Sequence, residues 1–287
     1  MDKAAPEPFS VLMPVYAGVD PAFLTRAFES VTVDQQRRPE EVVVVRDGPV
    51  PDPLEARLQE LIAGSPVPVT VVELPENRGV AIALQSGLAA CRFDIVARMD
   101  ADDVSVPERF AVQVPLVESG VDLVGSALAE MGKDEHDLRG IRRPPLTHAA
   151  IDRSARFSSP FNHPTVVFRR AVVDRVGGYE QLMHLEDYWL WARMLSGGAH
   201  AANVAQPLLL FRVGAGTYER RGGWRLVGPE IELQRRMRRL GFTSRAQFVR
   251  NVLVRGVWRL VPVSLRRAVY GRVFVRRGGD GIPTATT

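Results

Sequence analysis

Short apolar segments alternate with segments of helical periodicity over the first hundred residues. Continuous apolar or β-branched runs predict strands at residues 9–15, 42–45, 67–74 and 94–99. Apolar residues spaced three and four apart predict helices between them, at 21–31, 54–62 and 80–90. Because strands that alternate with helices form βαβ units, we expect an α/β fold with a mostly parallel central sheet.

The pattern is less regular beyond residue 120. Strands are predicted at 121–129, 165–168 and 208–213, helices at 171–176 and 186–195, and a polar loop at 132–145. Near the C-terminus, amphipathic helices are predicted at 248–261 and 265–274. The apolar stripe of the first consists of Val249, Val252, Leu253, Val257, Leu260 and Val261. Its arginines lie largely off that stripe.

Composition places the chain among soluble globular proteins. Hydrophobic residues make up 46% of its 287 residues and charged residues 24%, which excludes a disordered or fibrous chain. Cys91 is the only cysteine, so no internal disulfide is possible and a cysteine-based zinc site is disfavoured. We find no secretory signal and no apolar run near the ~18–20 residues that span a bilayer, so a cytoplasmic protein is expected.

The net charge of +4 is divided unevenly along the chain. Residues 212–287 carry 17 arginines and four acidic residues, a net +13, whereas residues 1–211 are at −9. A basic amphipathic tail is typical of proteins that lie on an anionic membrane surface, here the inner face of the cell membrane. The alternative is an appendage packed on the body or on a second subunit, so an oligomer is possible. No segment matches a nucleic-acid-binding module, and no such partner is expected.

Polar side chains follow each predicted strand of the first half. Tyr16 follows the first strand, Asp47 ends the second, Arg78 comes after the third, and Asp100 and Asp102 follow the fourth. Ligands of parallel sheets bind at the carboxyl ends of the strands, so these residues are expected to line one cleft. An arginine and free amides at a helix start favour phosphate. Arg78 and Asp47 are also ordinary cap and turn residues, which is the alternative.

Two acidic sequences suggest chemistry. The Asp-Ala-Asp sequence at 100–102 brings together two carboxylates, whose oxygens suit Mg²⁺ or Mn²⁺. The alternative is a solvated acidic turn. Glu186 and Asp187 adjoin aromatic residues, and an acid beside an apolar wall can act as a general base. The alternative is that both only favour the helix N-terminus. His163 is either a ligand or substrate contact or a structural histidine.

The order of these segments resembles inverting glycosyltransferases of family 2, which have the GT-A fold and include enzymes of bacterial cell-surface polysaccharide and lipid-linked glycan assembly. The resemblance covers roughly residues 9–213. The motifs that carry it are SVLMPVY at 10–16, EVVVVRDG at 41–48, the NRG helix start with Ala83, Gln85 and Gly87 at 77–87, DADD at 100–103, HPT at 163–165, GGY at 177–179 and EDYWLW at 186–191.

The resemblance implies a role for each matched residue. The residues that would contact the nucleotide or its diphosphate are Pro14, Val15, Tyr16, Asp47, Arg78, Arg98, Asp100 and Ala101. Asp102, with Asp100, would hold Mn²⁺ or Mg²⁺, and Asp187 would be the catalytic base. The residues on the acceptor or sugar side would be Glu186, Trp191, Tyr179 and His163.

The resemblance also implies an organisation and an activity. A catalytic domain would span residues 1–213, with a nucleotide-binding half at about 9–103 and an acceptor half at about 104–213, and a basic helical tail would follow at 214–287. The enzyme would transfer a hexose, with inversion, from a nucleotide diphosphate sugar to a hydroxyl of a saccharide or lipid-linked saccharide. A UDP-sugar is the default donor.

Two alternative functions remain beside this interpretation, and the chain departs from the family's sequence pattern at two places. A nucleotidyltransferase needs a glycine-rich basic loop after the first strand, which residues 16–20 do not supply. A non-catalytic membrane-associated nucleotide-binding protein is the other alternative. Arg46 replaces the first aspartate of the family's D-D-G-S sequence, so base recognition is expected to differ from the usual uridine pattern. The segment 212–216 lacks the metal-binding histidine of many relatives, so the metal would rely on carboxylates, diphosphate and water.

Overall fold

The structure is a computed structural model that describes residues 5–214, 224–260 and 275–276. Its strands are β1 Phe9–Val15, β2 Glu41–Asp47, β3 Val69–Leu74, β4 Ile95–Arg98, β5 Val104–Ser105, β6 Leu123–Met131, β7 Leu138–Arg142, β8 Val167–Arg169, β9 Ala201–Arg212 and β10 Val275–Arg276. Its α-helices are α1 Pro21–Val31, α2 Asp52–Ala63, α3 Val80–Ala90, α4 Arg109–Glu118, α5 His148–Ala155, α6 Arg170–Arg175, α7 Glu186–Ser196, α8 Val227–Arg239 and α9 Arg245–Leu260. Two short 3-10 helices are η1 His163–Thr165 and η2 Trp224–Leu226.

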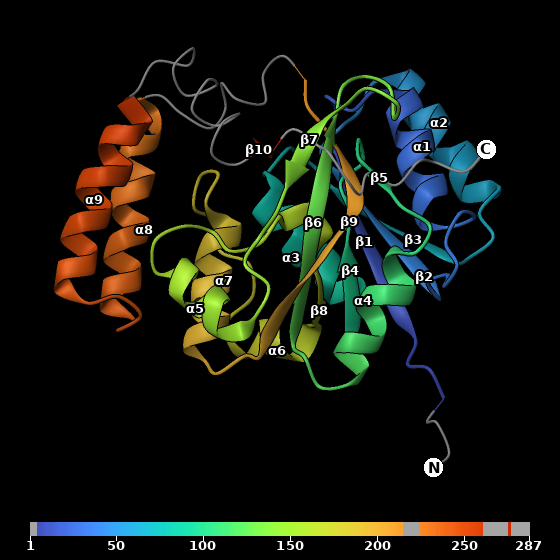
Figure 1. Ribbon diagram of the computed structural model, residues 1–287. Helices are drawn as coiled ribbons and strands as arrows, with labels where there is room; N and C mark the ends of the chain where they lie inside the picture. Colours follow the sequence, from blue (N-terminus) through green and yellow to red (C-terminus); the bar gives the residue numbers. More distant parts are fainter. Residues whose placement is uncertain (1–4, 215–223, 261–274, 277–287) are drawn as a thin grey trace.

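The strands form a single sheet in the order β10-β7-β6-β8-β4-β1-β2-β3. Strand β9 pairs with β6, and β5 pairs with β9. Strands β3, β2, β1 and β4 are parallel, and Val11 lies opposite both Val42 and Ala97. Strand β8 pairs antiparallel with β4 and with β6, so the strand direction changes there. Figure 1 shows helices on both faces of this sheet. The predicted α/β fold is therefore confirmed.

Two segments in the second half differ from the prediction. The predicted polar loop is wrong over Leu138–Arg142, which forms β7 and pairs antiparallel with β6. Only Gly140 and Ile141 of β7 are buried, so its apolar pattern is too short to indicate a strand. Strand β9 begins at Ala201, well before residue 208, and runs parallel to β6. Both strands exist because β6 offers partners on two sides.

Apolar side chains of the parallel strands alternate between two cores, as the two-residue period of a strand requires. Val43 and Val45 belong to the core that contains Leu84 of α3. Val42 and Val44 belong to the core on the other face, with residues of α1, α2 and α4. The central strands are thus covered on both faces, which explains their continuous β-branched sequence.

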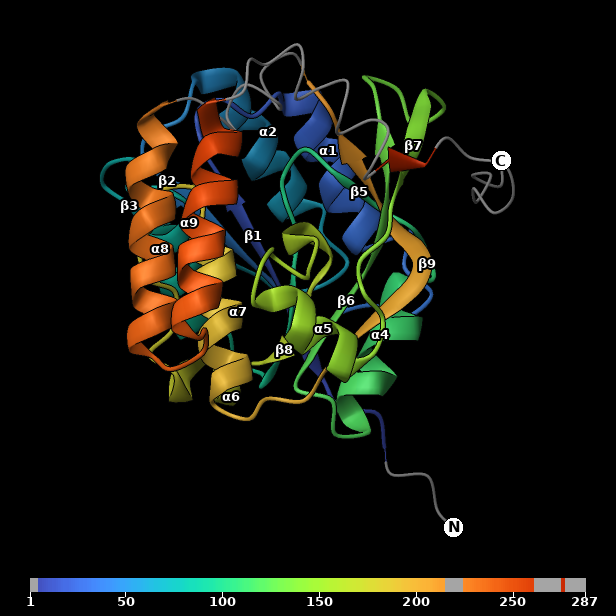
Figure 2. The ribbon, with the colours of Figure 1, turned by 60° about the vertical axis from the view of Figure 1, so that its left-hand side comes forward.

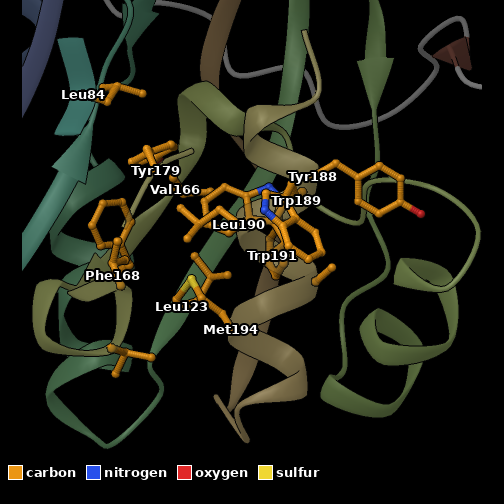
Figure 3. Close-up of a cluster of buried hydrophobic side chains, with 14 of the residues drawn as sticks. Leu84, Leu123, Val166, Phe168, Tyr179, Tyr188, Trp189, Leu190, Trp191 and Met194 are labelled. Carbon is orange, nitrogen blue, oxygen red and sulfur yellow. The ribbon is translucent and has the colours of Figure 1, made fainter. Parts of the chain in front are cut away.

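Helix α7 runs through the first of these cores (Figure 3). Its Tyr188, Leu190, Trp191 and Met194 are at most 1% exposed. Protein interiors are close-packed, so a helix buried over this length cannot turn about its axis without opening the core. The orientation of its first turn, which begins at Glu186, is therefore fixed by packing.

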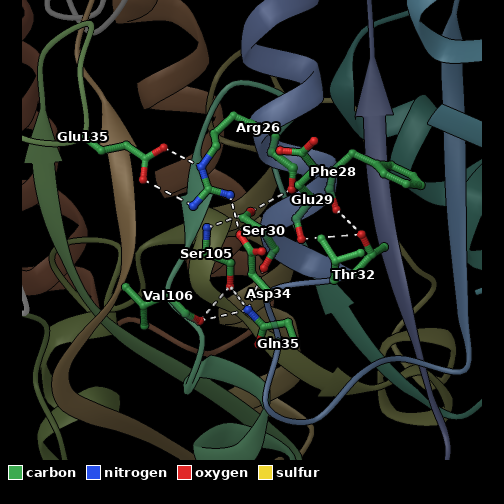
Figure 4. A network of polar contacts seen from close by, with 12 residues as sticks. Arg26, Phe28, Glu29, Ser30, Thr32, Asp34, Gln35, Ser105, Val106 and Glu135 are labelled. Atoms are coloured by element: carbon green, nitrogen blue, oxygen red, sulfur yellow. Dashed lines mark hydrogen bonds and ion pairs between the residues drawn. The ribbon is translucent and has the colours of Figure 1, made fainter. Parts of the chain in front are cut away.

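A polar network ties helix α1 to β5 and to the turn after β6 (Figure 4). Arg26 pairs with Asp34 and with Glu135, each at 2.6 Å. Gln35 donates from Nε2 to the Ser30 carbonyl at 2.6 Å and to the Val106 carbonyl at 2.9 Å. These contacts fix the segment that directly follows the acidic sequence at 100–103.

The C-terminal helices α8 and α9 pack side by side on the body (Figure 2). Leu233 and Met237 of α8 are fully buried in the same core as α7. Helix α9 begins at Arg245, close to the predicted start. No helix in the described part of the chain is long and apolar enough to cross a bilayer. The tail helix predicted at 265–274 lies outside the described residues.

Candidate active site

The carboxyl ends of β4, β1 and β2 meet at one edge of the sheet, because these strands are parallel neighbours. Tyr16 follows β1, Asp47 ends β2, and Asp100 follows β4. Tyr16 is 48% exposed at this edge, Pro14 is half-buried, and Val15 is buried. The structure therefore brings these predicted residues together where ligands of parallel sheets bind.

Three carboxylates form an acidic cluster after β4. One carboxylate oxygen from each of Asp100, Asp102 and Asp103 lies within 4.8 Å of the other two. Burial and the charge of Asp100 raise the pKa of Asp102 to about 6. Burial and the charges of Asp102 and Asp100 raise the pKa of Asp103 well above its usual range. Three acids this close disfavour one another's ionised forms.

The cluster fits a divalent cation. Mg²⁺ and Mn²⁺ take oxygen ligands, and a cation relieves the repulsion that raises these pKa values. Asp103 also has a buried oxygen, Oδ2, with no hydrogen-bond partner among the described residues. Asp102 and Asp100 are the predicted metal ligands, and Asp103 is a third carboxylate that was not among the predicted ligands. The only sequence signal for it is its place as the last residue of the DADD sequence.

Arg98 holds the first acid of the cluster. It donates from Nη1 to Asp100 Oδ2 at 2.8 Å and pairs through its second terminal nitrogen with Oδ1. The Arg98 side chain is buried, and its Nε has no partner among the described residues. Beneath it, Arg109 donates to the Arg98 carbonyl at 2.7 Å. Burial and the charge of Arg98 lower the pKa of Arg109 to about 9.

Arg212, at the end of β9, orders the acidic turn from the other side. Its Nε donates to the Asp102 carbonyl at 2.8 Å, and its main-chain N–H donates to Asp103 Oδ1 at 2.9 Å. The guanidinium also lies 3.8 Å above the ring of Phe23 in α1. Arg212 begins the segment 212–216, which lacks the histidine expected from the resemblance. Nothing in the local sequence pattern indicated this role.

Asp47 shapes the loop that precedes α3. Its carboxylate accepts from the main-chain N–H groups of Arg78 at 2.7 Å and Gly79 at 3.0 Å. Gly48 has φ +83°, and a Cβ there would lie 2.5 Å from the Asn77 nitrogen, so the turn requires glycine. Arg78 itself is exposed. The structure thus gives the Asp47 carboxylate a positioning role, and its contact with a nucleotide stays a prediction.

Glu186 and Asp187 occupy the first turn of α7, and both are half-buried. Burial and the charge of Asp187 raise the pKa of Glu186 to about 7. Asp187 Oδ1 accepts from the Tyr188 main-chain N–H at 2.7 Å. The Tyr188 side chain is directed away from this acid pair, because its hydroxyl donates to the Ala155 carbonyl at 2.8 Å.

The other predicted acceptor-side residues form an aromatic group beside this turn. His163 Nε2 and the Tyr179 hydroxyl are 3.0 Å apart, and the Trp191 ring meets His163 edge-on at 5.8 Å. Burial and the charge of Arg98 lower the pKa of His163 well below its usual range, so the ring is neutral. Gly178, with φ +71°, lies against Gln85 of α3, whose Oε1 accepts from Tyr179 N.

The two halves of the site meet around Tyr179. The pKa of its hydroxyl is raised by burial, and the charges that act on it come from Arg98, Asp187, Glu186 and Asp100. The acidic cluster and the acid pair of α7 therefore lie within electrostatic reach of one side chain. Gln181 adds a direct link, since its Nε2 donates to the Arg78 carbonyl at 3.2 Å.

Arg46 does not face this centre. It pairs with Glu55 at 2.6 Å and with Glu73 at 2.9 Å. These three residues line a hollow of about 420 Å³ beside the ends of β2 and β3. No residue of the acidic cluster lines that hollow. The replacement of the family's aspartate by Arg46 is therefore accommodated by two glutamates in this part of the chain.

The family of the chain follows from its similarity to known proteins. Residues 10–177 match the family described as "Glycosyl transferase family 2", and the chain belongs to this family. It is 36% identical over 265 residues to the amylovoran biosynthesis glycosyltransferase AmsE of Erwinia amylovora, covering 91% of this chain and 97% of that protein. It is 32% identical over 270 residues to the UDP-Gal:alpha-D-GlcNAc-diphosphoundecaprenol beta-1,3-galactosyltransferase of Escherichia coli. That match covers 93% of this chain and 97% of that protein.

Solved structures confirm the predicted fold. The mannosyltransferase PcManGT from Pyrobaculum calidifontis, in complex with GDP-Man and Mn²⁺, superposes with a TM-score of 0.63 at 18% identity. The match covers 94% of this chain and 76% of that one. At this identity the likeness concerns the fold alone. The predicted family and the predicted GT-A architecture are both confirmed.

Proposed function

We propose that this glycosyltransferase is a metal-dependent, inverting hexosyltransferase that uses a UDP-sugar and a lipid-linked saccharide acceptor in polysaccharide assembly. The observation that carries the proposal is the acidic cluster of Asp100, Asp102 and Asp103, with Tyr179 within electrostatic reach of both that cluster and Asp187. The Escherichia coli relative is named for UDP-Gal and a diphosphoundecaprenol-linked acceptor, and AmsE for amylovoran biosynthesis, which supports the donor and acceptor classes.

On the donor side, Asp102 and Asp100 would hold Mn²⁺ or Mg²⁺, with Asp103 beneath them. The ion, when bound, stabilises the negative charge that develops on the leaving diphosphate. Arg98 contributes a buried positive charge at the same place. Tyr16, with Pro14 and Val15 beneath it, would contact the nucleotide base and ribose, and the loop held by Asp47 would lie against the same group.

On the acceptor side, Asp187 would accept the proton of the attacking hydroxyl. As that oxygen bonds to the anomeric carbon, the bond from this carbon to the diphosphate oxygen breaks, and UDP leaves with the electron pair. One displacement from the face opposite the leaving group inverts the anomeric centre. The pKa of about 7 keeps Glu186 mostly protonated below neutral pH.

The aromatic group would define the acceptor or sugar pocket. Tyr179 and neutral His163 offer hydrogen-bonding groups that do not carry charge near neutral pH. Trp191 is fully buried, so its part is to hold the His163 ring in place rather than to contact the sugar. Neutral donors and acceptors suit the hydroxyl groups of a saccharide.

The proposed organisation keeps a catalytic region at 1–213 and a basic tail that holds the enzyme on the cytoplasmic face of the membrane. The burial of Leu233 and Met237 means that α8 also supports the catalytic region. A lipid-linked acceptor lies at the membrane surface, so peripheral attachment would place donor-bound enzyme beside it.

Product analysis tests this proposal. UDP-hexoses and a short-chain diphosphate-linked saccharide are mixed with the full chain and Mn²⁺, and we expect free UDP and a product with the opposite anomeric configuration by NMR. EDTA should stop the release and added Mn²⁺ should restore it. Transfer that persists in EDTA and in Asp102→Ala contradicts metal dependence. A product of unchanged configuration contradicts inversion, and release of pyrophosphate instead of UDP contradicts glycosyl transfer.

A further inference from the structure

Helix α9 directs Asn251 and Arg255 toward the protein and exposes three aliphatic side chains. Asn251 is fully buried, and Arg255 is half-buried against the body. Val249, Leu253 and Val254 are 52%, 62% and 51% exposed. At about 100° per residue Val249 and Leu253 lie opposite Asn251 and Arg255, and Val254 lies at the edge of the same exposed surface. We call Val249, Leu253 and Val254 the α9 outer face.

Buried polar contacts prevent the helix from rolling to hide this face. Arg255 Nε donates to Glu230 Oε1 at 2.6 Å, and the Glu230 side chain is 0% exposed. Asn251 Nδ2 donates to the Arg156 carbonyl at 2.7 Å and to Gln234 Oε1 at 2.9 Å. A roll that buried the outer face would pull the Arg255 guanidinium away from the buried Glu230 carboxylate, which is strongly unfavourable. The aliphatic side chains are therefore held outward.

Positive charge surrounds the outer face. Arg245 is exposed on the same helix, next to Val249 by helical angle. Arg250 is also exposed, but its guanidinium donates to Asn251 Oδ1 at 2.8 Å and lies 4.8 Å from the centre of the Phe157 ring. Between residues 224 and 256 the chain has eight arginines and only two acids, and both acids are paired: Glu230 with Arg255 and Glu232 with Arg236. The other exposed arginines, such as Arg239, have no carboxylate partner in the described part of the chain. This combination of aliphatic and cationic groups matches a membrane surface with anionic headgroups.

Helix η2 adds an aromatic side chain to this region. Trp224 is 75% exposed, and η2 lies against α9 and α8. Tryptophan is favoured where the headgroups meet the acyl chains, because its ring is apolar and its N–H is a donor. An exposed tryptophan on an element that contacts α9 adds a side chain suited to an interfacial contact.

We propose that the α9 outer face is the surface with which this protein docks onto an anionic lipid bilayer. The proposal rests on the proposed function in one respect: a lipid-linked acceptor places the enzyme's work at that bilayer. The aliphatic side chains enter the headgroup boundary while the exposed arginines Arg245 and Arg239 meet lipid phosphates. The helix lies flat, and the buried Glu230–Arg255 pair fixes its orientation to the catalytic body.

Vesicle binding of the full chain tests this assignment. We compare wild type with a Val249→Ser/Leu253→Ser variant on phosphatidylcholine vesicles with and without phosphatidylglycerol. Removing two aliphatic contacts is expected to weaken partitioning to anionic vesicles by about tenfold or more. A Val33→Ser/Leu146→Ser variant is the matched control, since these side chains are 45% and 43% exposed on the body. It should bind as wild type does.

Charge and competing occupants are separated by further measurements. Arg239→Gln/Arg245→Gln should weaken binding to anionic vesicles and leave the weak binding to neutral ones unchanged. Wild-type vesicle binding by Val249→Ser/Leu253→Ser overturns the proposal. So does a change of sedimentation coefficient in that variant without a change in vesicle binding, which would assign the face to a second copy of the chain. UDP release with a water-soluble acceptor should be unaffected by these variants. If the wild type released no UDP with any tested donor and acceptor, the proposed function would be rejected, and the vesicle-binding result would still stand.

Discussion

Arg98 and Asp100 form a two-point ion pair at the end of β4, at the entrance to the acidic cluster. One contact is a hydrogen bond of 2.8 Å from Nη1 to Oδ2, and the other joins Nη2 to Oδ1. The Arg98 side chain is 5% exposed and that of Asp100 25% exposed. Asp102 makes no such pair, although it is the predicted principal metal ligand. Asp100 and Asp102, which are separated by one residue, are therefore expected to differ in what they contribute to folding and to binding.

Substitution of each acid by its amide should separate these contributions. Asp100→Asn leaves a buried guanidinium without its carboxylate, so we expect the free energy of unfolding to fall by about 2 kcal/mol, a value reduced because Asp100 is partly exposed. Asp102→Asn removes a carboxylate whose pKa of about 6 lies above its unfolded value. Its ionised form disfavours folding, so this variant should be no less stable than wild type at pH 8.

Urea denaturation at pH 8 and calorimetry with Mn²⁺ measure both effects. Asp102→Asn should lose Mn²⁺-dependent UDP binding at full stability. An equal loss of stability in the two variants would contradict the distinct roles assigned to these acids.

Asp187→Asn tests the proposal that Asp187 is the catalytic base for the acceptor hydroxyl. The amide keeps the size of the side chain but cannot accept the hydroxyl proton, so turnover should fall by at least about 10²-fold. Calorimetric UDP-sugar binding in the presence of Mn²⁺ should stay within a factor of a few of wild type, because the role proposed for Asp187 is on the acceptor side. Near-normal turnover in this variant would require another base.

Glu186 gives the acid pair a pH dependence. Its folded pKa of about 7 lies above the unfolded value, so the folded state holds the proton more tightly between the two values. Wild-type stability is therefore expected to decrease as the pH rises from about 4.5 to about 7. Glu186→Gln lacks this loss and should be more stable than wild type by about 1–2 kcal/mol at pH 8, with no gain at pH 4. Thermal unfolding curves at both pH values measure it; equal gains at both would point to an effect other than titration.

The fold of the first half was predictable because its signals are local. The run at 42–45 is β-branched and buried on both faces, and the helices between strands have clear apolar periods. Strand β7 was missed because its existence depends on pairing with β6 rather than on its own sequence. Helix α8 was also missed, since its mean hydropathy is low and only one narrow side is buried.

The site was predictable only in part for the same reason. Asp100, Asp102 and Asp187 stand out in sequence, and the structure places them around Arg98 and Tyr179. The role of Arg212 could not be read from its neighbours, because it acts on Asp102 and Asp103 across more than a hundred residues. The use of both Asp47 oxygens by the loop before α3 is likewise a product of the tertiary structure.

The Glu230–Arg255 pair supplies the last prediction, on how the tail is held. Glu230 is fully buried in α8, and Arg255 also lies over the Tyr188 ring at 5.4 Å, next to Asp187 in sequence. Arg255→Met keeps much of the apolar stem but removes the guanidinium from the buried Glu230 carboxylate, which should cost about 3 kcal/mol of unfolding free energy. The double variant Glu230→Met/Arg255→Met replaces both charges and should recover most of that loss, because well-packed apolar groups can substitute for a buried pair. Urea titration of wild type, the two single variants and the double variant gives the coupling energy, and a coupling near zero would show that α9 is held by its other contacts instead.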